Sequence, residues 1–78
     1  MHDYSELVGY IVKSIVSRPD DVRISMVEGE RTNRVEVSLS EEDVGKVIGR
    51  GGRNIDAIRA VVRAAALKNH DRVVVEIV

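Results

Sequence analysis

The stretch Val47-Ile48-Gly49-Arg50-Gly51-Gly52-Arg53-Asn54-Ile55 decides how this chain folds. Helical patterns precede and follow it, so its glycines predict a tight turn between two helices. Such a turn brings backbone N–H groups and a helix N-terminus to one exposed point, which favours a phosphate group. Glycine allows a ligand backbone to approach closely and adopts positive φ without a steric penalty. Lys46, Arg50 and Arg53 flank the turn and can add charge-assisted contacts.

Other glycine motifs do not fit this stretch. A dinucleotide-binding fingerprint read from Gly49 requires glycine or alanine at the position of Asn54, and it requires a preceding strand. A P-loop ends in Gly-Lys-Ser/Thr, and the sequence has no such ending. Gly45 and Gly49 have the spacing of a membrane-helix pair, but their surroundings are charged. The pattern therefore favours phosphate binding by the turn itself.

Towards the N-terminus, periodicity predicts a helix and then a hairpin. Apolar residues at helical spacing predict a helix over about 4–17, and Pro19 ends it because the residue before proline avoids the α region. These apolar residues are Leu7, Val8, Ile11, Val12, Ile15 and Val16. Alternation of apolar and polar residues over 22–26 and 35–39, with a polar turn between them, predicts two antiparallel strands.

Two positions have the sequence signature of a helix start. Asp3 is followed three residues later by Glu6, and Ser40 is followed three residues later by Asp43. The first pair resembles a capping box, in which two side chains satisfy the backbone donors at a helix N-terminus. The second pair marks another helix start and predicts a short helix that ends where the glycines begin, at Gly49.

A long helix over about 53–67 and a closing strand over 72–78 complete the chain. The resulting order is α-β-β-α-α-β. The crossover through two helices requires the second and third strands to run parallel if they are neighbours. We therefore predict an α+β fold in which three helices pack on one face of a three-stranded mixed sheet, and residues 1–78 form a single domain.

The charge is unevenly distributed along the chain. The net charge is −1, but residues 1–43 carry five Lys/Arg against ten Asp/Glu. Residues 44–70 carry six Lys/Arg against Asp56 alone, a net charge of +5. Such a distribution is typical of a modest anion-binding surface on an acidic protein, and a solvated helix with chance bias explains it equally well.

The element order with Val47-Ile48-Gly49-Arg50-Gly51-Gly52 between two helices resembles a type II KH domain. Further stretches are similar to the small bacterial KhpA family, so that the resemblance covers essentially the whole chain. They are Arg18-Pro19-Asp20-Asp21-Val22, Gly45-Lys46-Val47-Ile48-Gly49, Ile58-Arg59 and Arg72-Val73-Val74-Val75-Glu76-Ile77. The resemblance implies a cytoplasmic RNA-binding protein that acts as an RNA chaperone or post-transcriptional regulator. It also implies pairing as a homodimer or a heterodimer with a KhpB-like protein.

In that reading the glycine turn holds the backbone of about four nucleotides of single-stranded RNA, with bases over aliphatic side chains. The expected RNA-binding residues are Lys46, Val47, Ile48, Gly49, Arg50, Gly51, Gly52, Arg53, Ile55 and Arg59. Core packing explains Val44 and Ile55 more simply, whereas Ile48 suits a groove. The family usually has polar or charged residues at the two variable turn positions, so Gly51 predicts a more flexible turn and weak affinity.

One side of the long helix supports a second hypothesis. Small and apolar residues gather where a monomer should present polar groups. They are Ala57, Ala60, Val61, Ala64 and Leu67. We interpret them as a partner interface, in which case the chain is chiefly a dimerisation module whose RNA contacts a partner completes. The alternative is that alanine simply favours a helix on an exposed face.

Other classes of function lack support in the sequence. No residues form a catalytic constellation, so we expect no enzymatic activity and no small-molecule substrate. Cysteine is absent, and His2 and His70 are isolated, so we expect no metal or other cofactor. No apolar run could span a bilayer and no secretory signal is present, so we expect a cytoplasmic protein without a membrane segment.

Overall fold

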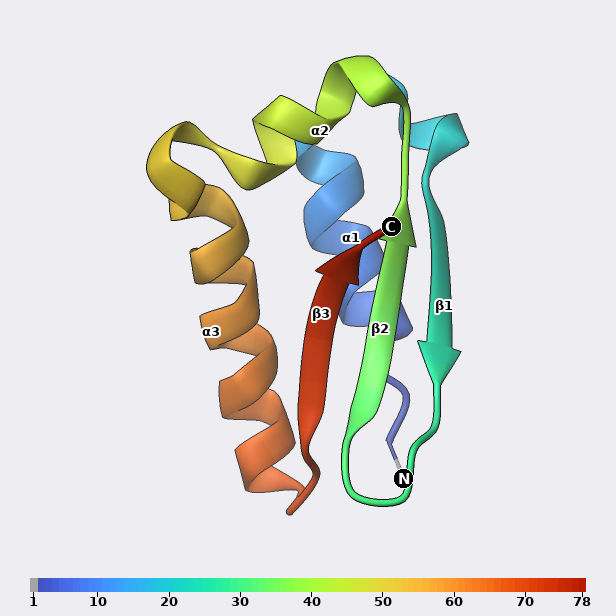
Figure 1. Ribbon diagram of the computed structural model, residues 1–78, viewed down its shortest axis with the longest axis vertical. Coiled ribbons are helices and arrows are strands. Elements are labelled where there is room, and N and C mark those ends of the chain that lie inside the picture. The colour runs from blue at the N-terminus through green and yellow to red at the C-terminus, as the bar shows by residue number, and fades with distance from the viewer. Residues whose placement is uncertain (1) are drawn as a thin grey trace.

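The computed structural model describes residues 2–78, and its elements follow the predicted order (Figure 1). The helices are α1 (Ser5–Ile15), α2 (Glu41–Ile48) and α3 (Arg53–Lys68), and the strands are β1 (Arg23–Val27), β2 (Asn33–Ser38) and β3 (Val73–Ile77). Single 3-10 turns, η1 (Pro19–Asp21) and η2 (Arg50–Gly52), precede β1 and α3. Within residues 2–78, no helix is both long and apolar enough to cross a bilayer.

The three strands form one mixed sheet in the order β1-β2-β3. β1 runs antiparallel to β2, with Ile24 opposite Val37, and β2 runs parallel to β3, with Val37 opposite Ile77. The chain passes from β2 to β3 through α2 and α3, which is the crossover that a parallel pair requires. The helices cover one face of the sheet, and β3 is an edge strand beside α3 (Figure 1). The predicted α+β fold is confirmed.

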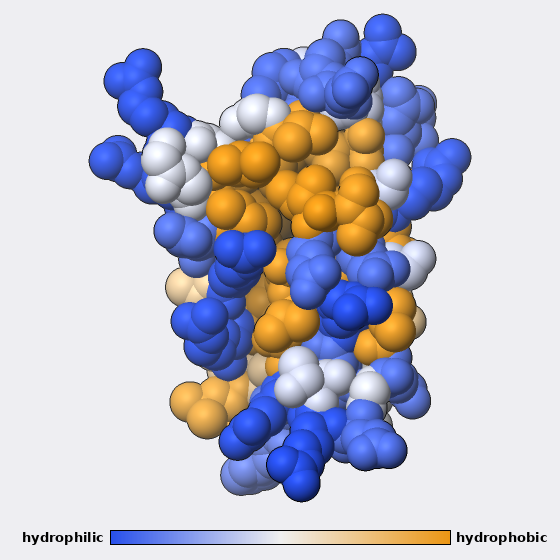
Figure 2. Space-filling view, viewed as in Figure 1, coloured by the Kyte–Doolittle hydropathy of each residue, from blue (hydrophilic) through white to orange (hydrophobic). Residues whose placement is uncertain are grey.

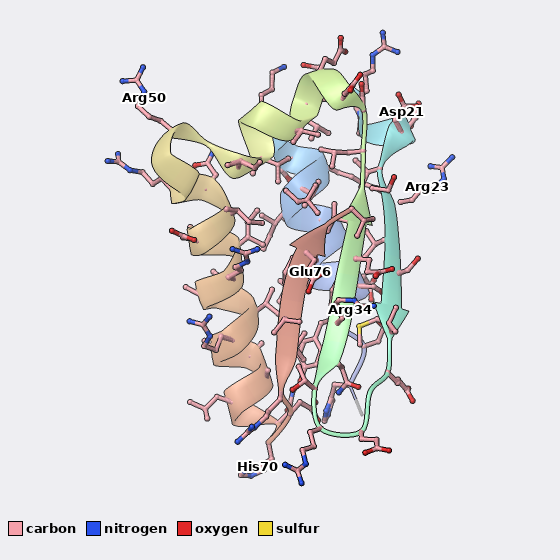
Figure 3. The ribbon with its side chains drawn as sticks, in the orientation of Figure 1. Asp21, Arg23, Arg34, Arg50, His70 and Glu76 are labelled. Atoms are coloured by element: carbon pink, nitrogen blue, oxygen red, sulfur yellow. The ribbon has the colours of Figure 1, made fainter. Side chains whose placement is uncertain are left out.

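The core between the sheet and the helices consists mainly of valine. Its buried apolar residues are Tyr4, Val8, Val12, Val22, Val35, Val37, Val47, Ile55, Ile58, Val62, Ala66 and Val75. Successive strand residues point to opposite faces of a sheet. Val35 and Val75 therefore face the helices, whereas Arg34 and Glu76 lie on the open face (Figure 3).

A buried carboxylate joins α2 to the segment that leaves α1. Asp43 is fully buried, and its two oxygens accept hydrogen bonds from the N–H groups of Ser17 and Arg18, each at 3.0 Å. The Lys46 ammonium lies 3.5 Å from this carboxylate and also binds the Ser17 hydroxyl. The hydrogen bond from Ser17 is the main cause that lowers the pKa of Asp43 below its ordinary value of 3.8, because it favours the charged form.

The helix start predicted at Ser40 is confirmed, because Ser40 is the N-cap residue of α2. Ser40 makes no side-chain hydrogen bond to the start of α2, and Asp43 turns inward instead of pairing with it. The resemblance of Asp3 and Glu6 to a capping box is not confirmed. Asp3 accepts a hydrogen bond from the N–H of Ser5 at 2.8 Å and does not pair with Glu6. Sequence spacing marks side chains that can cap a helix, but donors that lie closer in space compete for the same oxygens.

Replacing Asp43 by asparagine tests its role in stability. The amide keeps the size of the side chain but turns one acceptor oxygen into a donor, which then faces a backbone N–H. We expect the midpoint of thermal unfolding, followed by circular dichroism, to fall by on the order of 10 °C. The matched control Glu42→Gln removes a carboxylate whose ion pair with Arg18 is exposed. It should shift the midpoint by only about 2 °C.

The pH dependence of the same pair of proteins gives a second readout. The pKa of Asp43 is lowered in the folded protein, so its stabilising contribution is present above the unfolded pKa near 3.8. That contribution is lost as the pH falls through the folded value. The difference in stability between the wild type and Asp43→Asn should therefore stay constant down to about pH 5 and shrink at more acidic pH. A difference that persists unchanged at pH 2 contradicts an ionised Asp43.

Candidate nucleic-acid interface

Three glycines hold the connection between α2 and α3 in a left-handed conformation. The angle φ is +77° at Gly49, +65° at Gly51 and +79° at Gly52. Residues with a Cβ rarely adopt such angles, which explains why glycine occupies these positions. Residues 49–52, called the glycine turn below, form the upper left corner of the molecule in Figure 1.

Asn54 supports the glycine turn from the first turn of α3. Its Nδ2 donates a hydrogen bond to the carbonyl oxygen of Lys46 at 2.8 Å, which satisfies an acceptor near the end of α2. A Cβ on Gly49 would lie 2.7 Å from Asn54 Cγ, so contact as well as φ requires glycine there. A Cβ on Gly51 would have nothing within 4 Å. Sequence reasoning missed Asn54, because no local pattern shows that its amide reaches the carbonyl of Lys46 on the other side of the turn.

The glycine turn brings backbone N–H groups to the start of α3. The N–H of Gly49 donates to the carbonyl of Gly45 at 2.8 Å, and the N–H of Gly52 donates to the carbonyl of Gly49 at 3.1 Å. Arg50 and Gly51 are exposed at the apex of the turn, shortly before α3 begins at Arg53. N–H groups next to a helix N-terminus attract anions. The main chain of Arg50 and Gly51 is therefore the part of the turn best placed to meet a phosphate.

Arg50 and Arg53 add positive charge at this corner. Both are exposed, and neither takes part in an ion pair within the described part of the chain. Arg50 points away from the molecule into solvent (Figure 3). Lys46, the third predicted cation, is held by Asp43 and Ser17. The two arginines are thus better placed than Lys46 to meet a phosphate.

An apolar patch lies next to the glycine turn. Figure 2 shows it in the upper half of this face, where Figure 1 has α2, the beginning of α3 and the C-terminal end of β3. Ile48 is 37% exposed, and Val44 and Ile77 are half-buried. Val47 is fully buried and Ile55 is only 6% exposed, because both pack into the core. The prediction that these two side chains contact a ligand is therefore corrected.

A hollow of about 350 Å³ lies between α3 and β3. Arg59 and Arg63 line it from the helix, and residues 73–76 line it from the strand. The Nε of Arg59 donates to the carbonyl oxygen of Val75 at 3.1 Å, which satisfies an acceptor on the edge strand. The structure thus puts Arg59, which was predicted to contact a ligand, in the wall of this hollow.

The opposite side of α3 carries the predicted partner interface. Ala57 and Val61 line an apolar hollow of about 300 Å³ together with residues of α1, including Ile11 and Ile15. Val61 is 49% exposed. The remaining predicted interface residues, Ala60, Ala64 and Leu67, are also exposed. Leu67 lies apart from this hollow and lines another one, with Arg63 and Arg72.

Comparison with known proteins identifies the family. Residues 5–77 match the model described as KhpA/KhpB, KH domain. The chain belongs to the KhpA/KhpB KH-domain family. It is 52% identical over 73 residues to RNA-binding protein KhpA of Clostridium perfringens, covering 94% of this chain and 97% of the relative. It is 46% identical over 72 residues to RNA-binding protein KhpA of Borreliella burgdorferi, covering 92% of this chain and 88% of the relative.

A solved structure supports the KH fold independently. A crystal structure of Aquifex aeolicus Era bound to GDP and aluminium fluoride matches the whole chain with a TM-score of 0.62 and 15% identity. The match covers 33% of the Era chain, and at this identity it shows the fold alone. The KhpA relatives are named as RNA-binding proteins, which agrees with the prediction that this KH domain is not an enzyme.

Alanine substitutions should change stability by different amounts at the three glycines of this region. Gly49→Ala forces an unfavourable φ and a clash with Asn54, so we expect a loss of about 2–4 kcal/mol of stability. Gly51→Ala meets only the unfavourable φ and should cost about 1–2 kcal/mol. Gly45 lies in α2 with a negative φ and open space around it, so alanine should stabilise by about 0.5–1 kcal/mol.

Urea unfolding followed by circular dichroism measures all three variants. Gly45→Ala is the matched control, because it adds the same methyl group one helical turn before Gly49. Equal losses for Gly49→Ala and Gly51→Ala would show that the contact with Asn54 does not constrain the turn.

Proposed function

We propose that this KH domain binds single-stranded RNA, with the glycine turn holding the sugar-phosphate backbone. One observation carries the proposal: the exposed main chain of Arg50 and Gly51 lies at a helix N-terminus, beside two arginines without ion pairs in the described part of the chain and next to an apolar patch. Backbone donors and charge suit phosphates, and the apolar patch suits the faces of bases. The names of the KhpA relatives support RNA as the ligand.

In this mechanism the main-chain donors of Arg50 and Gly51 take one phosphate, and the side chains of Arg50 and Arg53 contact its neighbours. The bases of about four nucleotides lie over Ile48 and Val44 and extend towards Arg59. Binding therefore depends on the polymer backbone more than on base edges. Lys46 is expected to contribute less to RNA binding than the two arginines, because its ammonium already binds Asp43 and Ser17.

Weak and unselective binding follows from the residues at hand. Aromatic stacking, which contributes about 1–3 kcal/mol per base, has no ring to use near the turn. Tyr4 is buried and its hydroxyl donates to Asp71 at 2.6 Å, and Tyr10 lies on α1. Gly51 makes the turn more flexible, so ordering the turn on RNA costs more conformational entropy. These properties suit an RNA chaperone or post-transcriptional regulator in the cytoplasm, which meets many sequences.

Changing both Arg50 and Gly51 to aspartate tests this proposal. Two carboxylates would then face the phosphates, so affinity for a short single-stranded oligonucleotide should fall at least about tenfold in fluorescence anisotropy at low salt. The positive φ of Gly51 should cost the variant about 1–2 kcal/mol of stability, but the fold and pairing should be retained because both side chains would point into open space or solvent. The matched control, Lys13→Asp with Ser14→Asp on α1, makes the same change in net charge at two exposed positions and should retain binding.

The salt dependence of binding is the second readout of that experiment. Each phosphate neutralised on a single strand contributes about −0.7 to the slope of log affinity against log salt, so a few contacts give a shallow slope. Undiminished binding by the double aspartate variant, with its fold intact, refutes the assignment of RNA binding to the glycine turn.

A second candidate function is pairing through α3, with itself or with a KhpB-like KH protein. The apolar hollow beside Ala57 and Val61 favours it. At 100° per residue, this side lies opposite Arg59 and Arg63 on the helix. A partner and RNA can therefore occupy α3 at the same time. If pairing is the chief role, the partner completes the RNA contacts.

Val61→Asp tests the partner interface. A carboxylate buried in an apolar contact is strongly unfavourable, so the affinity of self-association should fall at least about tenfold. Sedimentation velocity at tens of micromolar measures the loss, and Val27→Asp on β1 is the matched control at an exposed valine. A wild type that sediments only as a monomer, together with unchanged binding of a KhpB-like partner by Val61→Asp, rules out this interface.

A further inference from the structure

The hollow beside α3 continues towards the far end of the molecule. A second hollow, of about 310 Å³, shares Arg63, Val73 and Val74 with it and reaches Arg72. A third, of about 470 Å³, shares Arg72 with the second and reaches Arg31 in the loop between β1 and β2. Each hollow shares lining residues with the next, and together they run from the middle of α3 to the end opposite the glycine turn, where Figure 3 labels His70. This series of hollows is called the depression below.

Arginines line each part of this depression. Arg31, Arg63 and Arg72 come from a loop, a helix and the start of a strand, and the fold brings them to one end of the molecule. All three are exposed, and none takes part in an ion pair within residues 2–78. A guanidinium with its donors open binds phosphate oxygens in a planar, two-point geometry. These three residues are called the distal arginine cluster below.

Acidic groups at this end do not cancel the positive charge. Glu30 and Asp71 line the third hollow, and the hydrogen bond from Tyr4 lowers the pKa of Asp71, which favours its charged form. Lys68, in the last turn of α3, is a further exposed cation at this end of the helix, although it does not line the three hollows. The C-terminal end of α3 contributes about half a negative charge. The end as a whole remains positive.

We propose that the distal arginine cluster is a second phosphate-binding site for the same RNA strand, beyond the nucleotides held at the glycine turn. This inference rests on the proposed RNA-binding function and extends it. RNA is the occupant that the geometry favours, because the depression joins the groove wall at Arg59 to the cluster. Glu76 lines the depression between the glycine turn and the distal arginine cluster. Phosphates therefore bind at the turn and at the cluster, and the RNA strand makes fewer contacts with positive side chains in between.

The proposal predicts that longer RNA binds more tightly and that the cluster supplies the gain. The probes are oligouridylates of about four and about ten nucleotides. Arg63→Gln and Arg72→Gln should each weaken binding of the longer probe by roughly two- to fivefold. Each should also reduce the steepness of its salt slope by about 0.7. Binding of the shorter probe should not change.

Lys13→Gln is the matched control, since it removes one exposed positive charge from α1 and should leave both probes unaffected. Amide chemical shifts at Arg63 and Arg72 should move with the longer probe only. The inference is overturned if lengthening the RNA gives no gain, or if Arg63→Gln and Arg72→Gln behave like the control. It is also overturned if these variants weaken self-association and not RNA binding, because the cluster then contacts protein.

The double aspartate variant of the glycine turn distinguishes a failure of the proposed RNA-binding function from a failure of the second phosphate site. If that variant still binds the shorter probe, the proposed function fails. If it loses the shorter probe while the cluster variants leave the longer probe unaffected, the glycine turn stands and only the second site fails.

Discussion

The hydrogen bonds of Asp43 are the constraint on which the end of this KH domain that carries the glycine turn depends. They fix α2 to the backbone of Ser17 and Arg18, where the chain leaves α1. α2 then presents the carbonyl oxygen of Lys46 to Asn54, which sets the spacing between the end of α2 and the start of α3. The glycine turn has few side chains of its own, so these polar groups on either side hold its shape.

Three sides of helix α3 face three different parts of the molecule. Ile58 and Val62 face the core, the arginines face β3, and the small apolar side chains face the hollow beside α1. The body of the protein is acidic, with ten Asp/Glu against five Lys/Arg over residues 1–43. Residues 44–70, which include α3, carry a net charge of +5. In the proposed function, this distribution of charge directs the RNA strand to the α3 side.

Much of the fold could be predicted because its signals are local. Hydrophobic period and turn residues predicted every helix and strand to within two residues at each end. The site was predicted less completely. The sequence could not reveal that Val47 and Ile55 are buried, because residues on either side of a turn look alike until the packing of α2 against α3 is known. It also missed Asp43 and Asn54, whose partners lie at other places along the chain.

By itself, the sequence determined the order of elements and the left-handed turn at Gly49, since periodicity and sterics between near neighbours decide both. Only the tertiary structure decided that β2 and β3 are neighbours and therefore pair in parallel, which apolar side chains reach the surface and which arginines line the depression. Arg31, Arg63 and Arg72 are far apart in the chain and meet only after the sheet and α3 have packed together. Those features depend on long-range packing, which no local pattern encodes.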